Sequence, residues 1–122
     1  MKLILQGDPR TKKNSQRLVN AGGRYIPLTS KAYADYERDC LRQISGDKQR
    51  YISSPVNVRC LYYMATRRRV DLNNLLEAST DILVKAGVLA DDNSRIVAGH
   101  DGSRVYYDKE NPRVEIEITG ID

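Results

Sequence analysis

Residues 67–77 place acidic side chains directly beside a run of arginines. Arg67-Arg68-Arg69 is followed after one residue by Asp71, and a second acidic pair stands at Asp91-Asp92. Guanidinium groups bind phosphate oxygens by charge and by fork geometry, and converging carboxylates hold a hard divalent cation that can activate water. This combination indicates phosphodiester chemistry, and we predict a metal-dependent nuclease.

These acidic positions also have a purely structural explanation. Asp71 opens a predicted helix, where an aspartate accepts hydrogen bonds from free backbone N–H groups and suits the positive end of the helix dipole. Asp91-Asp92-Asn93-Ser94 has ordinary turn composition. The metal site is favoured because the acids occur together with three arginines. Oxygen ligands with no His or Cys nearby predict Mg²⁺, with Mn²⁺ as an alternative.

The length of the chain fits one domain, and we predict that residues 1–122 form it. Cys40 and Cys60 lack metal or redox spacing and stand in apolar segments, so we expect buried free thiols in a reducing compartment. No apolar run is long enough to span a membrane, and the amino terminus is too short for a signal peptide. We therefore expect a cytoplasmic protein with no membrane partner.

Charge is distributed unevenly along the chain. Residues 1–70 carry 15 Lys and Arg against 5 Asp and Glu, whereas residues 71–122 carry 5 against 11. Such a division indicates a basic surface for a polyanion and an acidic cluster for cations, although charged faces also serve solubility. A basic segment without periodicity contains Arg10, Lys12, Lys13 and Arg17. From the residues alone, phosphate contact and a solvated loop explain this segment equally well.

Hydrophobic periodicity predicts an α/β (α+β) fold in which two main helices pack on a mixed sheet. One helix starts at Thr29 or Ser30 as N-cap and runs to about Ser45. The second covers 72–86, ends before Gly87, and has a polar face with Asn73, Asn74, Glu77, Asp81 and Lys85. Predicted strands cover 2–6, 56–65, 94–98, 103–107 and 113–119, with turns at 7–9 and 22–23.

With these motifs in place, the chain resembles the RusA-type Holliday junction resolvases, small endodeoxyribonucleases of phages and prophages. The resemblance covers most of the chain. It begins in the Gly7-x-Pro9-x-x-Lys12-Lys13 loop and is most specific over residues 69–92. There the family motifs stand as Asp71-Leu72-Asn73-Asn74, Asp81, Ala86-Gly87 and Asp91-Asp92.

The resemblance implies a homodimer that binds four-way DNA junctions and resolves them by paired Mg²⁺-dependent nicks during recombination and repair. By matching position, Asp71 and Asp92 are implied as catalytic metal ligands, and Asp91 belongs to the same motif. Contact with DNA is then favoured for the basic residues, which are Arg10, Lys12, Lys13, Arg67, Arg68 and Arg69.

Two positions depart from the family pattern. Asn73 replaces the middle acid of the motif, and Glu77 stands where better-known members have a functionally important lysine. Asn73 can still offer a carbonyl oxygen to a metal, and Glu77 lies on the same helical face. We expect Glu77 to restore the lost carboxylate as a catalytic residue. The missing positive charge would have to come from Lys12, Lys13 or Lys85.

The departures leave other interpretations open. Asn73 is either a natural difference or an engineered inactivating change. A catalytically silent junction-binding protein would bind four-way DNA but not nick it. A general nucleic-acid-binding or partner-binding domain, in which Asp71 is only a helix cap, would not prefer four-way over linear DNA.

Overall fold

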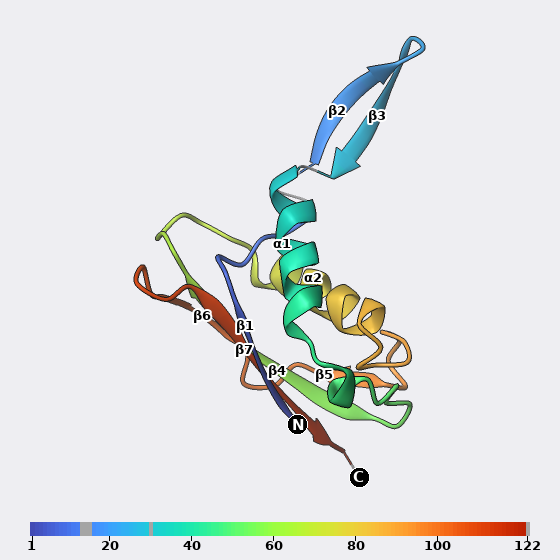
Figure 1. The fold of residues 1–122 in the computed structure, drawn as a ribbon, viewed down its shortest axis with the longest axis vertical. Helices are drawn as coiled ribbons and strands as arrows, with labels where there is room; N and C mark the ends of the chain where they lie inside the picture. The colour runs from blue at the N-terminus through green and yellow to red at the C-terminus, as the bar shows by residue number, and fades with distance from the viewer. Residues whose placement is uncertain (13–15, 30, 122) are drawn as a thin grey trace.

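A five-stranded mixed sheet carries two helices on one face (Figure 1). The computed structural model describes residues 1–12, 16–29 and 31–121, with 16–21 and 24–29 described by their backbone alone. The strand order is β1-β7-β4-β5, and β6 also pairs with β4. The strands of this sheet are β1 (Lys2–Gln6), β4 (Val56–Met64), β5 (Val97–Gly99), β6 (Arg104–Tyr107) and β7 (Arg113–Gly120).

The central strand β4 shows why this sheet has one buried and one open face. Its even-numbered residues are buried and its odd-numbered residues are half-exposed, the alternation expected when helices cover a single face. β7 pairs with it antiparallel, whereas β5 and β6 pair parallel with its first and last residues. The predicted fold class, a mixed sheet with two main helices, is confirmed.

Two helices cover the buried face of the sheet. They are α1 (Lys31–Gln43) and α2 (Leu72–Lys85), and a short 3₁₀ turn, η2, follows at Gly46–Lys48. The apolar arc of α2 lies in the core, where Leu75, Ile82 and Leu83 are almost fully buried. Cys40 and Cys60 are buried free thiols, as predicted. Within the described ranges, no helix is long and apolar enough to cross a membrane.

A two-stranded ribbon is the element that the sequence analysis missed. β2 (Gln16–Ala21) and β3 (Arg24–Thr29) pair antiparallel, and Figure 1 shows them projecting beyond the start of α1. The predicted turn at 22–23 is confirmed, with φ of 61° at Gly22 and 85° at Gly23, as tight hairpins require. Assigning residue 17 to a loop was wrong. A ribbon outside the main sheet need not carry the alternating apolar pattern by which the other strands were found.

The predicted strand at 94–98 is shorter than expected. Residues 94–96 form a turn, in which the backbone N–H groups of Ile96 and Val97 both donate to the Asn93 carbonyl. Ile96 is buried, so its apolar character reflects the core rather than a strand. Ser30, one of the two N-caps proposed for the first helix, lies outside the described residues.

Candidate functional site

The start of α2 presents Asp71 at the end of the loop that leaves β4. Asp71 has extended backbone angles, and its Oδ1 accepts a hydrogen bond from the backbone N–H of Asn73 at 2.9 Å. The N-cap prediction is therefore confirmed. The side chain is exposed, and no hydrogen bond joins its Oδ2 to the described part of the chain. Capping thus uses one carboxylate oxygen and leaves the other accessible.

Asp71 shares an open groove with an arginine. The groove is lined by Arg69, Val70, Asp71 and Asn74. Arg67, Arg68 and Arg69 are all exposed on the preceding loop, which we call the arginine loop. A guanidinium and a carboxylate on one groove wall can bind a phosphate and a cation side by side. The sequence predicted that arginine and aspartate side chains would lie side by side here, and Arg69 and Asp71 do share this groove.

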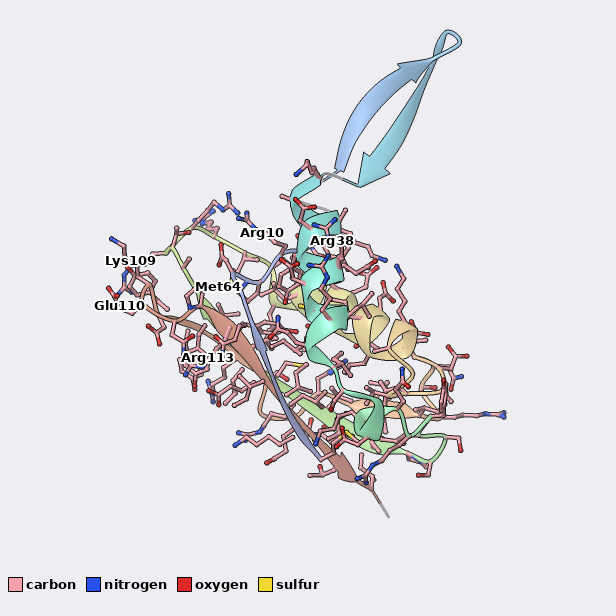
Figure 2. The ribbon with its side chains drawn as sticks, viewed as in Figure 1. Arg10, Arg38, Met64, Lys109, Glu110 and Arg113 are labelled. Carbon is pink, nitrogen blue, oxygen red and sulfur yellow. The ribbon has the colours of Figure 1, made fainter. Side chains whose placement is uncertain are left out.

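The loop after β1 brings Arg10 to the same end of the sheet. Asp8 Oδ1 accepts from the backbone N–H of Ala65 at 2.9 Å, which joins this loop to the end of β4. Arg10 is half-buried, and its guanidinium lies 3.7 Å from Asp8 Oδ2. Figure 2 labels Arg10 on this loop. The Asp8 side chain therefore links the loop that carries Arg10 to the end of β4, a contact that the sequence did not reveal.

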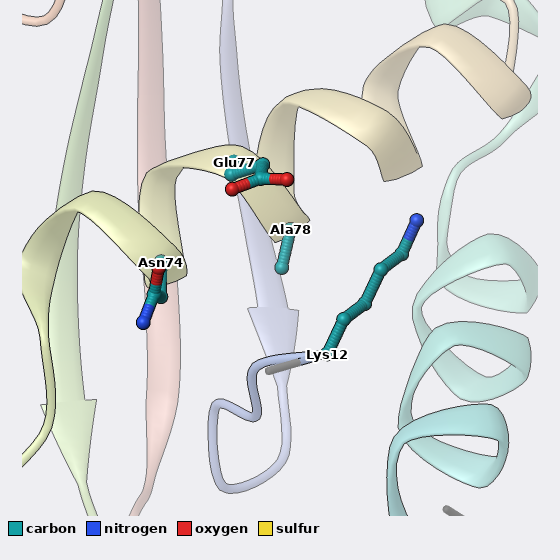
Figure 3. A pocket seen from close by; sticks show the side chains of 4 residues that line it. All are labelled: Lys12, Asn74, Glu77 and Ala78. Atoms are coloured by element: carbon teal, nitrogen blue, oxygen red, sulfur yellow. The ribbon is translucent and has the colours of Figure 1, made fainter. Parts of the chain in front are cut away.

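Lys12 lies against the polar face of α2. Its Nζ donates to Asp81 Oδ2 at 2.8 Å, and its side chain is only 33% exposed. Figure 3 shows Lys12 reaching toward the helix in a small pocket that Asn74, Glu77 and Ala78 also line. Lys12 is therefore not part of a fully solvated loop, and Asp81 compensates for the hydration that its ammonium loses.

The pKa of Lys12 is raised by this carboxylate-rich setting. The hydrogen bond with Asp81 is the main cause, the charges of Asp81, Glu37 and Glu77 add to it, and partial burial opposes it. Lys12 is therefore a firmly charged ammonium close to Glu77. Lys85 instead pairs with Glu37 on α1 at 2.9 Å, and Lys13 lies outside the described residues. Of these three lysines the structure describes Lys12 and Lys85, and it is Lys12 that lies beside Glu77.

Asp91 and Asp92 lie beyond the opposite end of α2. The helix has 14 residues, a length of about 20 Å at the usual rise per residue. The backbone N–H of Val88 donates to the Leu83 carbonyl, which keeps the following segment beside the C-terminal end of the helix. Figure 1 shows that segment, in orange, far from the start of α2. One chain therefore does not bring these aspartates to Asp71.

Local hydrogen bonds order the second acidic pair. Asp91 Oδ1 accepts from the backbone N–H of Asp92 at 2.7 Å, and Oδ2 accepts from Asn93 Nδ2 at 3.2 Å. These bonds lower the pKa of Asp91, the backbone bond contributing most. Asp92 is exposed. Across residues 1–12, 16–29 and 31–121, no three His, Cys, Asp or Glu side chains gather closely enough to hold a metal ion.

The predicted residues thus fall into two groups. Asp71, Asn73 and Glu77 lie along the first turns of α2, close to the arginine loop, whereas Asp91 and Asp92 lie at the far end. The role of Asp81 in holding Lys12 was not predicted, because a separation of 69 residues leaves no local signal. Nor did the sequence indicate a function for the exposed tyrosines of β6.

Comparison with known proteins gives a consistent result. A family model described as Endodeoxyribonuclease RusA matches residues 6–119. A crossover junction endodeoxyribonuclease rusA of Enterobacteria phage 82 is 39% identical over 74 residues, 60% of this chain and 59% of the relative. Proteins named crossover junction endodeoxyribonuclease RusA are 36% identical in Shigella sonnei strain Ss046 and 34% in Escherichia coli strain K12, each over 73 residues, 60% of this chain and 59% of the relative. These matches therefore span less than two thirds of the relatives' length.

Proposed function

The chain belongs to the RusA endodeoxyribonuclease family, and from this premise we propose that it is an endodeoxyribonuclease that resolves four-way DNA junctions by paired nicks. The observation that carries the proposal is the groove that Arg69 and Asp71 share at the start of α2. The arginine binds a DNA phosphate, and the carboxylate faces the same space. The reaction would serve recombination or repair of DNA in the cytoplasm.

Mg²⁺ is the proposed cofactor, with Mn²⁺ as a substitute. When bound, such a cation lowers the pKa of a water molecule and neutralises charge on the phosphate. One chain offers the exposed Asp71 carboxylate, the Asn73 amide oxygen and, one turn on, Glu77. These oxygens suit a hard cation, but they include only one carboxylate at the helix start. The donor set of a single chain is therefore incomplete.

A two-fold partner would complete the set. If the α2 helices of two subunits ran antiparallel beside each other, Asp71 of one chain would meet the partner subunit's Asp92, and the reverse would hold at the other end. Two equivalent sites would then stand about one helix length apart, on the order of 20 Å. Two sites related by two-fold symmetry suit the two opposed strands of a four-way junction. We therefore place the homodimer and the metal site in one proposal.

Glu77 and Lys12 modify this site in a way particular to this chain. Glu77 supplies a carboxylate one turn beyond the uncharged Asn73. The Lys12 ammonium lies close enough to Glu77 for the two charges to interact. We propose that Glu77 assists metal binding in place of the acid missing at 73. Lys12 would supply positive charge toward the DNA.

The test is nicking of a labelled synthetic four-way junction and a matched linear duplex, with Mg²⁺, with Mn²⁺ and with chelator. We expect junction-selective, metal-dependent nicks that Asp71→Asn abolishes while junction binding persists. Asp101→Asn, which changes an exposed aspartate on another loop, is the matched control and should nick normally. Equal loss in both variants, or nicking that survives Asp71→Asn, would contradict the proposal.

A second candidate function is a junction-binding protein that does not cleave. It is favoured by one observation: Asp71 and Glu77 are the carboxylates of the first two turns of α2, and Lys12 partly offsets the charge of Glu77. This function predicts tight junction binding in chelator and no nicks at any Mg²⁺ or Mn²⁺ concentration. Restoring the acid with Asn73→Asp would then produce nicking where the natural chain has none.

A further inference from the structure

The edge strand β6 presents aromatic side chains to solvent beside the arginine loop. All four of its residues are exposed, and Val105, Tyr106 and Tyr107 keep 39%, 43% and 39% of their surface accessible. Together with Arg67 and Arg68 they line an open hollow, whose wall also includes Met64 and Thr66. Figure 2 labels Met64 near the end of the sheet where Lys109 and Glu110 form the next turn.

The exposed rings of β6 lie on opposite faces of the sheet, Tyr107 toward the hollow and Tyr106 away from it, and each has a cationic or aromatic neighbour. The Arg67 guanidinium lies over Tyr107, 4.2 Å from the ring centroid. Tyr106 stacks on Tyr63 with centroids 5.3 Å apart, and Arg113 covers Tyr63 at 3.8 Å. The contact with Arg67 fixes the exposed Tyr107 ring in a defined orientation without burying it, and the stack on Tyr63 does the same for Tyr106. The hollow is therefore an ordered aromatic surface that remains open to a ligand.

Charge narrows the chemistry of that ligand. Arg67 and Arg68 line the hollow, and no acidic residue belongs to its described wall. Asp108, the next residue after Tyr107, is bound by Arg113 at 2.9 Å. A cationic and aromatic surface is complementary to a group that carries both negative charge and a flat π-system.

A nucleotide with an unpaired base has both properties. In a linear duplex the bases are stacked and paired, so such DNA would offer the arginines its phosphates and leave the tyrosines without a partner. A single strand can turn a base onto an aromatic ring while its phosphates meet the guanidinium groups. An apolar protein segment would use the rings but would leave both arginines desolvated and unpaired.

We infer that this hollow binds an unpaired DNA nucleotide, with its base on Tyr107 and its phosphates on Arg67 and Arg68. The inference rests on the proposed function for the identity of the nucleic acid as DNA. The arginine loop continues directly to Asp71, so a strand held here enters the groove of Arg69 and Asp71. Bases that lose their partners at the crossover of a junction would be captured beside the candidate cleavage site, which favours branched over linear DNA.

Fluorescence tests the inference directly, because the chain has no tryptophan. Tyr107→Trp places a single reporter in the hollow, and Tyr51→Trp serves as the matched control at another tyrosine, 63% exposed, that packs on Gly87 beyond the far end of α2. We expect a thymine oligonucleotide to quench the reporter at 107 saturably and to leave the control unchanged. Absence of quenching at 107, or equal quenching in both variants, would overturn the inference.

Affinity supplies a second, independent readout. Tyr107→Ala should weaken binding of the single-stranded oligonucleotide about tenfold, the effect of losing one stacked base, and Tyr107→Phe should retain binding. Binding of linear duplex should be unchanged in both. The inference is overturned if the phenylalanine variant is as weak as the alanine variant, or if the loss is equal for duplex. It is also overturned if the reporter at 107 responds to protein concentration without DNA, because a second copy of the chain would then occupy the hollow.

The two proposals fail in different ways. Quenching of the reporter at 107 together with no nicking of any junction would support the nucleotide site and contradict the proposed nuclease function. Junction-selective nicking together with an unquenched reporter would support the proposed nuclease function and contradict the inferred nucleotide site.

Discussion

Mixing two inactive variants would reveal whether each cleavage site draws on two chains. Asp71→Asn removes the carboxylate at the start of α2, and Asp92→Asn removes one beyond its far end. Each variant alone should be inactive, because every site in either homodimer would lack one acid. Both residues are exposed, so neither substitution should leave a buried polar group without a partner.

The expected activity of the mixture follows from the geometry. In a heterodimer, one site combines both substituted residues, and the other combines the two intact aspartates. Random exchange makes about half of the dimers heterodimers, and each has one working site, so the mixture should show about a quarter of the wild-type rate of nicking. The products should be single nicks, because no dimer in the mixture has two working sites.

The assay compares the mixture with each variant alone on the same labelled four-way junction. The two proteins are unfolded together and refolded, or incubated until subunits exchange, before Mg²⁺ is added. If each site were contained in one chain, every site in the heterodimer would still lack an acid, and mixing would restore nothing. An inactive mixture in which heterodimers are demonstrably present would therefore refute the shared site.

Three further predictions concern α2 and its surroundings. Glu77→Gln should reduce nicking while junction binding in chelator stays unchanged. Full nicking by this variant would contradict a role for Glu77 in the site. Lys12→Met should cost roughly 0.2–1 kcal/mol of unfolding free energy near neutral pH, because it removes a partly exposed ion pair. The raised pKa of Lys12 makes the pair's contribution complete below the unfolded value of 10.5 and lost as pH rises through the folded value. Urea unfolding at pH 7 and above pH 11 should therefore show a smaller difference between variant and wild type at the higher pH. Gly87→Ala should cost about 1–2 kcal/mol, because φ at this position is +79°. The added methyl would also approach the Tyr51 ring, and unchanged thermal stability would contradict this reasoning.

The main elements were predictable because they bury one face against the core. The alternation in β4 and the apolar arc of α2 both follow from that arrangement, and the capping role of Asp71 follows from local backbone chemistry. The hairpin of β2 and β3 was missed because the strands stand outside the main sheet. Apolar periodicity reveals a helix or strand only when one of its faces packs against the core.

The candidate site was predictable only in part, for a related reason. The neighbours of Asp71 in the groove were identified, because Arg69, Val70 and Asn74 all lie within three positions of it in the sequence. The contact between Lys12 and Asp81 joins residues far apart in sequence and needed the folded chain. The predicted metal ligands Asp71 and Asp92 are separated in one chain by the length of the helix between them. This separation follows from the predicted bounds of the helix, 72–86, which the structure reproduces to within one residue.

The central proposal is junction resolution by two coordinated sites, and a supercoiled plasmid with an extruded cruciform tests it most directly. Two nicks on opposed strands within one binding event convert the plasmid to a linear form, whereas independent nicks give open circles first. We predict linear product in Mg²⁺ and none in chelator, with a plasmid that lacks the cruciform left intact. Equal cutting of both plasmids in Mg²⁺, or no cutting of either in Mg²⁺ or Mn²⁺, would contradict the proposal.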